Sequence, residues 1–217
     1  MTQGPFDGSA AGKVILLGEH AVVYGVPGIA AGIERGARAR AEPRRDDAST
    51  AGSTLTLGGH TYVAGDTSDL GRAFGALLSV PPAIDRVVDV GAEAEIPPGG
   101  GLGCSAALAV AISRATMLAS GLPLDDDAVM QRATAWESVF HGNPSGIDTA
   151  AACLGTCMRF ERGAGATAIA QPGDLWLAVG YSGSSASTKE MVEGIAKLKH
   201  KRPELVDKFL AAVRSLV

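Results

Sequence analysis

The chain has 217 residues, of which 46% are hydrophobic, enough for a buried core in one domain or in one domain and part of another. With 19 Lys and Arg against 23 Asp and Glu, the net charge is −4, so no basic surface indicates nucleic acid or an anionic membrane as a partner. No apolar run approaches the roughly 20 residues that cross a bilayer, and the first residues do not resemble a signal peptide. We expect a cytoplasmic protein that binds a small molecule.

The first hundred residues favour a sheet. Short β-forming runs predict strands over 12–17, 28–33, 37–42 and 54–57, the last ending at the turn residues Gly58 and Gly59. A helix is expected over 69–79. The alternating run 86–96 predicts one more strand, which Pro97 and Pro98 terminate.

Two helices are predicted next. The Ala-rich stretch from Gly103 to about Ser120 has no proline, and Gly121 stands where a C-terminal cap is expected. The acidic run 125–127 supplies the cap and first turn of a second helix, which continues to Phe140.

The remaining residues alternate between strand and helix patterns. Strands are expected over 156–161 and 175–182, and helices from Ser187 to about Arg202 and from there to the end. The Gly- and Ala-rich segment 162–174 is predicted to be a linker, and Trp136 and Trp176 are predicted to lie in the core. Cys104, Cys153 and Cys157 are odd in number and lack zinc-site spacing, so we expect reduced thiols.

The strongest chemical signal is the segment PPGGGLGCSAALAV at 97–110, in which a glycine-rich loop joins a strand to a helix. Glycines let backbone N–H groups approach a polyphosphate, and the helix N-terminus adds partial positive charge and unpaired donors. A tight turn before a packed helix is the alternative. A P-loop is excluded because the nearest match, Gly8 to Lys13, is one residue short.

A dinucleotide-binding loop stays open as a weaker alternative. Gly101, Gly103 and Ala106 meet its glycine pattern, and Asp125 follows at about the expected distance. That acidic residue should end a second apolar strand, whereas the residues before Asp125 indicate a turn between helices.

Two further segments carry charged residues at the ends of predicted elements. The first, GKVILLGEHAVVYGVP at 12–27, places Lys13 at one end of a strand and Glu19 and His20 at the other. The second contains Glu137 on a helix and then HGNPSGID at 141–148, where proline and glycine fix a turn before Asp148. Taken alone, Lys13 fits a surface lysine and Asp148 fits a helix cap.

Together, in this order, the three segments resemble the superfamily of galactokinase, homoserine kinase, mevalonate kinase and phosphomevalonate kinase (GHMP kinases). GKVILLGEHAVVYG, HGNPSGID and SSASTKEMV at 184–192 are most similar to its mevalonate kinase branch. The resemblance implies an α+β fold: an N-terminal ATP-binding domain over 1–165, like ribosomal protein S5 domain 2, with a mixed sheet and helices on one side. It also implies that 166–217 begin a ferredoxin-like C-terminal domain that the chain does not complete.

The resemblance also implies an activity, ATP-dependent phosphorylation of mevalonate with Mg²⁺, and a role for each site residue. Asp148 would orient the attacking hydroxyl, Lys13 would pair with Asp148, and Ser105 and Glu137 would hold Mg²⁺. Contacts to the acid substrate or the phosphates are implied for Glu19, His20, Ser145 and Thr188. The residues implied to bind the nucleotide are Pro98, Gly99, Gly100, Gly101, Leu102, Gly103, Cys104, Ser105 and Ala106.

The chain departs from the superfamily pattern in three places. Ala11 replaces a usual proline, Cys104 replaces the first of two loop serines, and the third glycine-rich motif, usual in the C-terminal domain, is not found before Val217. An uncovered apolar face would then favour self-association, for example as a homodimer. Two alternatives stay open: a kinase of the same superfamily acting on phosphomevalonate, a sugar or homoserine, and a non-catalytic ATP-binding fragment.

Overall fold

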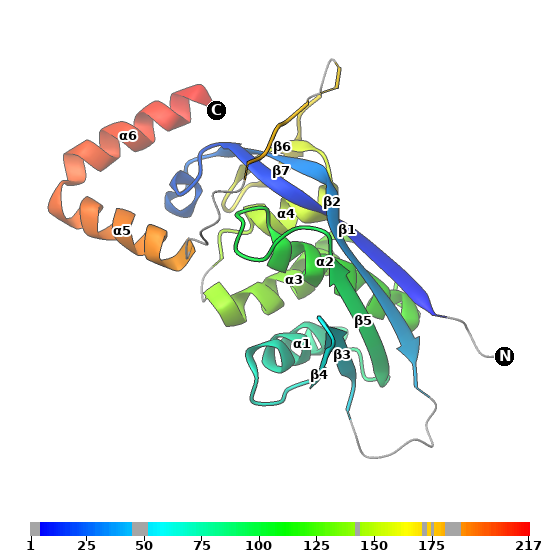
Figure 1. The fold of residues 1–217 in the computed structure, drawn as a ribbon. Coiled ribbons are helices and arrows are strands. Elements are labelled where there is room, and N and C mark those ends of the chain that lie inside the picture. Colours follow the sequence, from blue (N-terminus) through cyan, green and yellow to red (C-terminus); the bar gives the residue numbers. More distant parts are fainter. Residues whose placement is uncertain (1–4, 45–51, 142–143, 171–172, 175, 181–187) are drawn as a thin grey trace.

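A seven-stranded mixed sheet with helices on one side forms the body of the molecule (Figure 1). The computed structural model describes residues 5–44, 52–141, 144–170, 173–174, 176–180 and 188–217. The strands are β1 (Phe6–Leu17), β2 (Gly28–Pro43), β3 (Thr54–Leu57), β4 (His60–Val63), β5 (Val88–Ala94), β6 (Cys157–Glu161) and β7 (Gly165–Ala168). Their order is β4-β3-β5-β2-β6-β7, with β1 paired along β2.

Strand β2 is longer than the sequence indicated. The predicted strands 28–33 and 37–42 are one continuous strand, which pairs with β1 through a register shift after Ala11. Glycine at position 36 makes this continuity feasible, because a Cβ there would lie 1.9 Å from the Ala10 carbonyl oxygen. Strand β4 was not predicted, and it forms a hairpin with β3 across two glycines with positive φ, Gly58 and Gly59.

The helices are α1 (Asp69–Ser79), α2 (Cys104–Ala119), α3 (Asp126–His141), α4 (Ile147–Leu154), α5 (Thr188–Lys201) and α6 (Pro203–Leu216), and η1 (Ala21–Tyr24) is a short 3₁₀ turn. Helix α2 is central: it packs on β1, β2 and β5, and both α3 and α4 cover it. Its many alanines explain how it is buried by the sheet and by helices at once. The opposite face of the sheet carries exposed Arg38, Arg40 and Glu42, so the helices lie on one side, as predicted.

The C-terminal quarter of the chain corrects three predictions. The described residues 176–180, inside the strand predicted over 175–182, have no regular structure, and Trp176 is 89% exposed instead of buried. An extended apolar segment needs a neighbouring strand for its backbone hydrogen bonds, and none pairs with 176–180 in the described part of the chain. The linker predicted over 162–174 contains β7, which pairs with β6.

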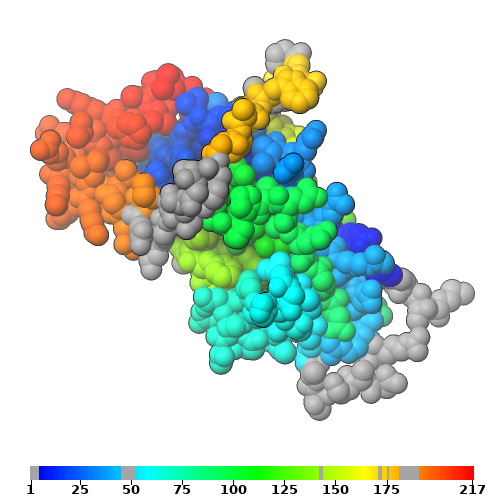
Figure 2. Space-filling view, viewed as in Figure 1, coloured from blue at the N-terminus to red at the C-terminus, as the bar shows by residue number. Residues whose placement is uncertain are grey.

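Helices α5 and α6 form a separate layer against the N-terminal segment. Figure 2 shows them, in orange and red, beside the blue residues near η1. Val206 and Leu210 of α6 pack against Ala21 and Val26, and the Arg214 guanidinium donates to the Gly25 carbonyl oxygen at 2.6 Å. Among the described helices, none is both long and apolar enough to cross a membrane. The division of the chain at residue 165 stays a prediction.

Candidate active site

Lys13 and Asp148 meet at the centre of the site. The Lys13 ammonium lies 3.0 Å from Asp148 Oδ1, although 135 positions separate the two residues in the sequence. Lys13 is delivered by β1 and is 4% exposed, while Asp148 stands in the first turn of α4 with 38% of its side chain exposed. The Asp148 carboxylate is therefore neutralised on one side and open to a ligand on the other.

The glycine-rich loop lies against Lys13. The Lys13 backbone N–H donates to the Leu102 carbonyl oxygen at 2.9 Å, which fixes the loop to β1. Gly103 has a φ of +74°, and a Cβ on it would lie 2.7 Å from Lys13 Cγ. Position 103 therefore needs glycine for its backbone conformation and for the space that the lysine stem occupies.

The loop ends at the N-terminus of α2, where no side chain caps the helix. Its cap residue, Gly103, provides no side-chain acceptor, and no acidic residue stands in the first turn. The first N–H groups of a helix have no acceptor inside the helix, and they carry about half a positive charge together. Gly99, Gly101 and Gly103 all have positive φ, a backbone form that aims successive N–H groups toward an anion. These features fit a polyphosphate.

Ser105 and Glu137 form an oxygen-rich pair beside the loop. The Ser105 hydroxyl donates a short hydrogen bond to Glu137 Oε1, and His141 Nε2 lies 3.6 Å from Glu137 Oε2. Burial raises the pKa of Glu137, and the Asp148 carboxylate raises it further; the Ser105 hydrogen bond and the charges of His141 and Lys13 act in the opposite direction. A hard divalent cation would stabilise the ionised form of this buried carboxylate. The Ser105 hydroxyl oxygen and the Glu137 carboxylate oxygen could both ligate it.

One cavity is lined by most of the predicted site residues. Those that line it are Lys13, Glu19, His20, Gly99, Gly101, Gly103, Cys104, Ser105, Ala106, Glu137, Ser145 and Asp148. Pro98, Gly100 and Leu102 belong to the loop but do not line the cavity. Thr188 begins α5, and its side chain is outside the described part of the structure.

Sequence reasoning missed six lining residues: Ile15, Val22, Val23, His141, Ile147 and Val192. Five are aliphatic and carry no chemical signal. His141 could have been found, because it follows Glu137 by four positions and so shares its helix face.

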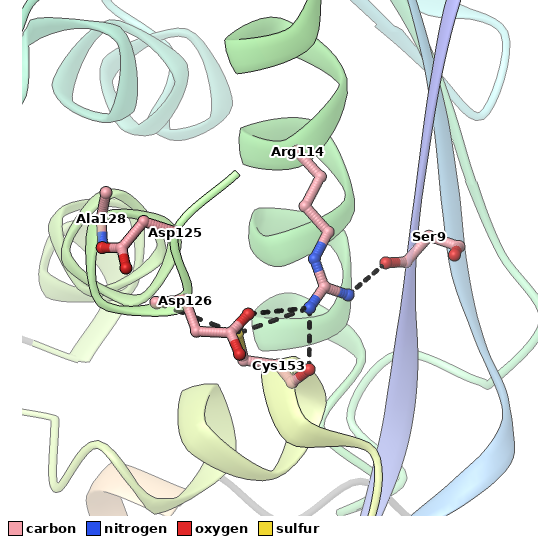
Figure 3. A network of polar contacts seen from close by, with 6 residues as sticks. All are labelled: Ser9, Arg114, Asp125, Asp126, Ala128 and Cys153. Carbon is pink, nitrogen blue, oxygen red and sulfur yellow. Dashed lines mark hydrogen bonds and ion pairs between the residues drawn. The ribbon is translucent and has the colours of Figure 1, made fainter. Parts of the chain in front are cut away.

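Asp125 has a structural role. Its carboxylate accepts from the Ala128 N–H at 3.0 Å and thus caps α3 (Figure 3). It follows a turn after α2 and does not end a strand, so it stands in the wrong place for a dinucleotide-binding acid.

A second polar network joins the elements that carry the site (Figure 3). Arg114 of α2 donates to the Ser9 carbonyl oxygen of β1 and to the Cys153 carbonyl oxygen of α4, both at 2.8 Å. It also lies 3.5 Å from the Asp126 carboxylate of α3. Ser105 lies on α2, Lys13 on β1, Asp148 on α4 and Glu137 on α3, so one guanidinium contacts or belongs to all four elements that carry the site.

The fold and this site define a small-molecule kinase of the GHMP superfamily. The pattern described as "GHMP kinases N terminal domain" matches residues 69–156, which include the loop, Ser105, Glu137 and Asp148.

Two sequence relatives specify the branch. The chain is 34% identical to a mevalonate kinase of Thermococcus sibiricus, over 96% of this chain and 67% of that protein. It is also 34% identical to a mevalonate kinase of Archaeoglobus fulgidus, over 96% and 69%. The chain belongs to the mevalonate kinase family, and it spans about two thirds of the length of these relatives.

A solved structure agrees with this assignment. The L. major mevalonate kinase, crystallised in complex with R-mevalonate, is similar with a TM-score of 0.72 and 27% identity. The similarity covers 99% of this chain and 67% of that one.

Proposed function

We propose that this protein transfers the γ-phosphoryl group of ATP to the primary hydroxyl of mevalonate, giving 5-phosphomevalonate and ADP. The observation that carries the proposal is the ion pair between Lys13 and Asp148, 3.0 Å apart, beside an uncapped helix N-terminus and a glycine-rich loop. Family membership supports mevalonate as the acceptor.

In the proposed reaction, the hydroxyl oxygen of mevalonate forms a bond to the γ-phosphorus, and the bond from that phosphorus to the β–γ bridging oxygen breaks. The Asp148 carboxylate orients the hydroxyl and accepts its proton, while the Lys13 ammonium stabilises the negative charge that develops on the attacking oxygen. Phosphoryl transfer depends mainly on alignment and charge stabilisation, which a paired ammonium and carboxylate at a fixed distance supply.

The phosphates would be held by the backbone N–H groups between Gly99 and Ala106. Ser105 and Glu137 would hold Mg²⁺, which supplies positive charge to the β- and γ-phosphates when bound. The burial of Glu137, which is 5% exposed, and its hydrogen bond to Ser105 support this pair as the cation ligands, because both hold the two oxygens side by side. Glu19, His20, Ser145 and Thr188 are proposed to contact the acid substrate or the phosphates.

The test is transfer of label from [γ-³²P]ATP to a panel of acceptors: mevalonate, phosphomevalonate, galactose and homoserine. We expect a product only with mevalonate, identified by mass as 5-phosphomevalonate, and a loss of at least about 10²-fold in kcat for Asp148→Asn. Asp127→Asn, an exposed carboxylate in the first turn of α3, is the matched control and should retain activity. Preference for another acceptor, or full activity of Asp148→Asn, would contradict the proposal.

We also propose a cytoplasmic location and self-association as a homodimer. Leu205, Phe209 and Leu216 of α6 are 53%, 57% and 70% exposed, and this apolar surface supports self-association. Light scattering after size exclusion would give the mass in solution, and a monomer at all concentrations would contradict the homodimer.

A further inference from the structure

Trp136 precedes the proposed cation ligand Glu137 and reaches the other ligand, Ser105. Its indole N–H donates to Ser105 Oγ at 3.1 Å. The side chain is 1% exposed, and its ring lies 5.9 Å from that of Phe140. A buried tryptophan of this size is normally explained by packing alone, but here its only polar atom points at a residue of the site.

This contact fixes the orientation of the Ser105 hydroxyl. A serine hydroxyl has one proton and two lone pairs. Ser105 gives its proton to Glu137 Oε1, and it receives the indole N–H on one lone pair. Because an indole can only donate, the serine proton cannot turn toward Trp136, and the second lone pair remains for the cavity that Ser105 lines.

We propose that Trp136 is a positioning residue for the magnesium–nucleotide complex, which it affects through Ser105. The inference rests on the proposed function only in taking Ser105 and Glu137 as the cation ligands. Without the indole N–H, only the hydrogen bond to Glu137 restrains rotation of the hydroxyl, and the lone pair that faces the cavity is held less firmly. Affinity for Mg²⁺ with nucleotide should fall, whereas affinity for the nucleotide without metal should stay the same.

The test replaces only the N–H group. The chain has two tryptophans, so Trp176→Phe leaves Trp136 as the single one, and Trp176 is 89% exposed. In that background, 3-benzothienylalanine incorporated in place of tryptophan substitutes sulfur for the N–H and keeps the ring size. Trp136→Phe is the second variant, and Trp176→Phe alone is the control for both.

Calorimetry would measure ADP binding with Mg²⁺ and with EDTA. For both variants we expect an affinity for Mg·ADP about three- to tenfold lower than in the control, the usual effect of one hydrogen bond, and unchanged binding in EDTA. The concentration of Mg²⁺ for half-maximal activity should rise, while KM for mevalonate should not change.

Three outcomes would overturn the proposal: Mg·ADP binding equal to the control, equal losses with and without Mg²⁺, or no Mg·ADP binding by the control. The second outcome would assign Trp136 a packing role only. Failure of the proposed function is recognised separately, since the control would then bind Mg·ADP but transfer no phosphate to mevalonate.

Discussion

Replacing Gly103 by alanine tests whether the loop and the lysine are built as one unit. Its φ of +74° is left-handed, which costs an L-residue about 1–2 kcal/mol. The new Cβ would also lie 2.7 Å from Lys13 Cγ, and ordinary contact begins at 3.4 Å, so the lysine stem or the loop must move by 3.4 − 2.7 = 0.7 Å. A displacement of about 1 Å at a reacting group can cost about 10²-fold in rate.

Two other glycines separate the cost of backbone strain from the effect of displacing Lys13. Gly101 in the same loop and Gly121 after α2 have φ values of +74° and +71°, and a Cβ on either would meet nothing within 4 Å. All three alanine variants should therefore lose about 1–2 kcal/mol of unfolding free energy from backbone strain. Only Gly103→Ala should also displace Lys13.

The assay pairs urea unfolding with steady-state kinetics. We expect similar stability losses in Gly101→Ala and Gly121→Ala, with kcat reduced no more than a few-fold at position 121. Gly103→Ala should lose about 10- to 100-fold in kcat. If Gly103→Ala and Gly121→Ala have the same kcat, the close contact between Gly103 and Lys13 has no catalytic consequence, and the reasoning is refuted.

Three further predictions concern the scaffold. Arg114→Met should lower the unfolding free energy by about 2–3 kcal/mol, because charged hydrogen bonds to two carbonyl groups are lost; a change below 0.5 kcal/mol in urea unfolding would contradict this. Burial raises the pKa of Cys153 to about 12, against an ordinary 9.0, so iodoacetamide at pH 8 should label it only after unfolding; mass spectrometry that finds native labelling would contradict this. The Arg44 hydrogen bond lowers the pKa of Asp89, so the stability that Asp89 contributes is present above its unfolded pKa and is lost as pH falls through the folded one. Asp89→Asn should therefore cost no more than about 1 kcal/mol at pH 7, since the side chain is 47% exposed, and nothing near pH 2; an equal loss at both values would contradict this.

The sequence predicted the elements that its local chemistry determines. Helix α1 begins at Asp69 and ends at Ser79 as expected, because Ser68 caps it and the apolar positions have helical spacing. It also indicated Lys13 and Asp148 as candidate site residues, because both stand, like the glycine-rich loop, at the ends of predicted elements.

Other features depend on contacts that a linear pattern does not contain. The continuity of β2 depends on glycines facing β1, and β4 depends on a turn that reverses the chain onto β3. Trp176 and its neighbours have a strand composition, yet no strand pairs with residues 176–180 in the described regions. The aliphatic walls of the cavity, such as Ile147, have the same composition as core residues and become identifiable only in three dimensions.

The central claim is that Lys13 and Asp148 act as a unit on one hydroxyl group. The most direct measurement is a double-mutant cycle in kcat for mevalonate phosphorylation, with Lys13→Met, Asp148→Asn and the double variant. Each single change should cost about 10²-fold or more, and the double variant should lose little beyond the worse single, because removing either partner disables the pair. A double variant whose loss equals the product of the two single losses would show that the residues act independently and would contradict the account.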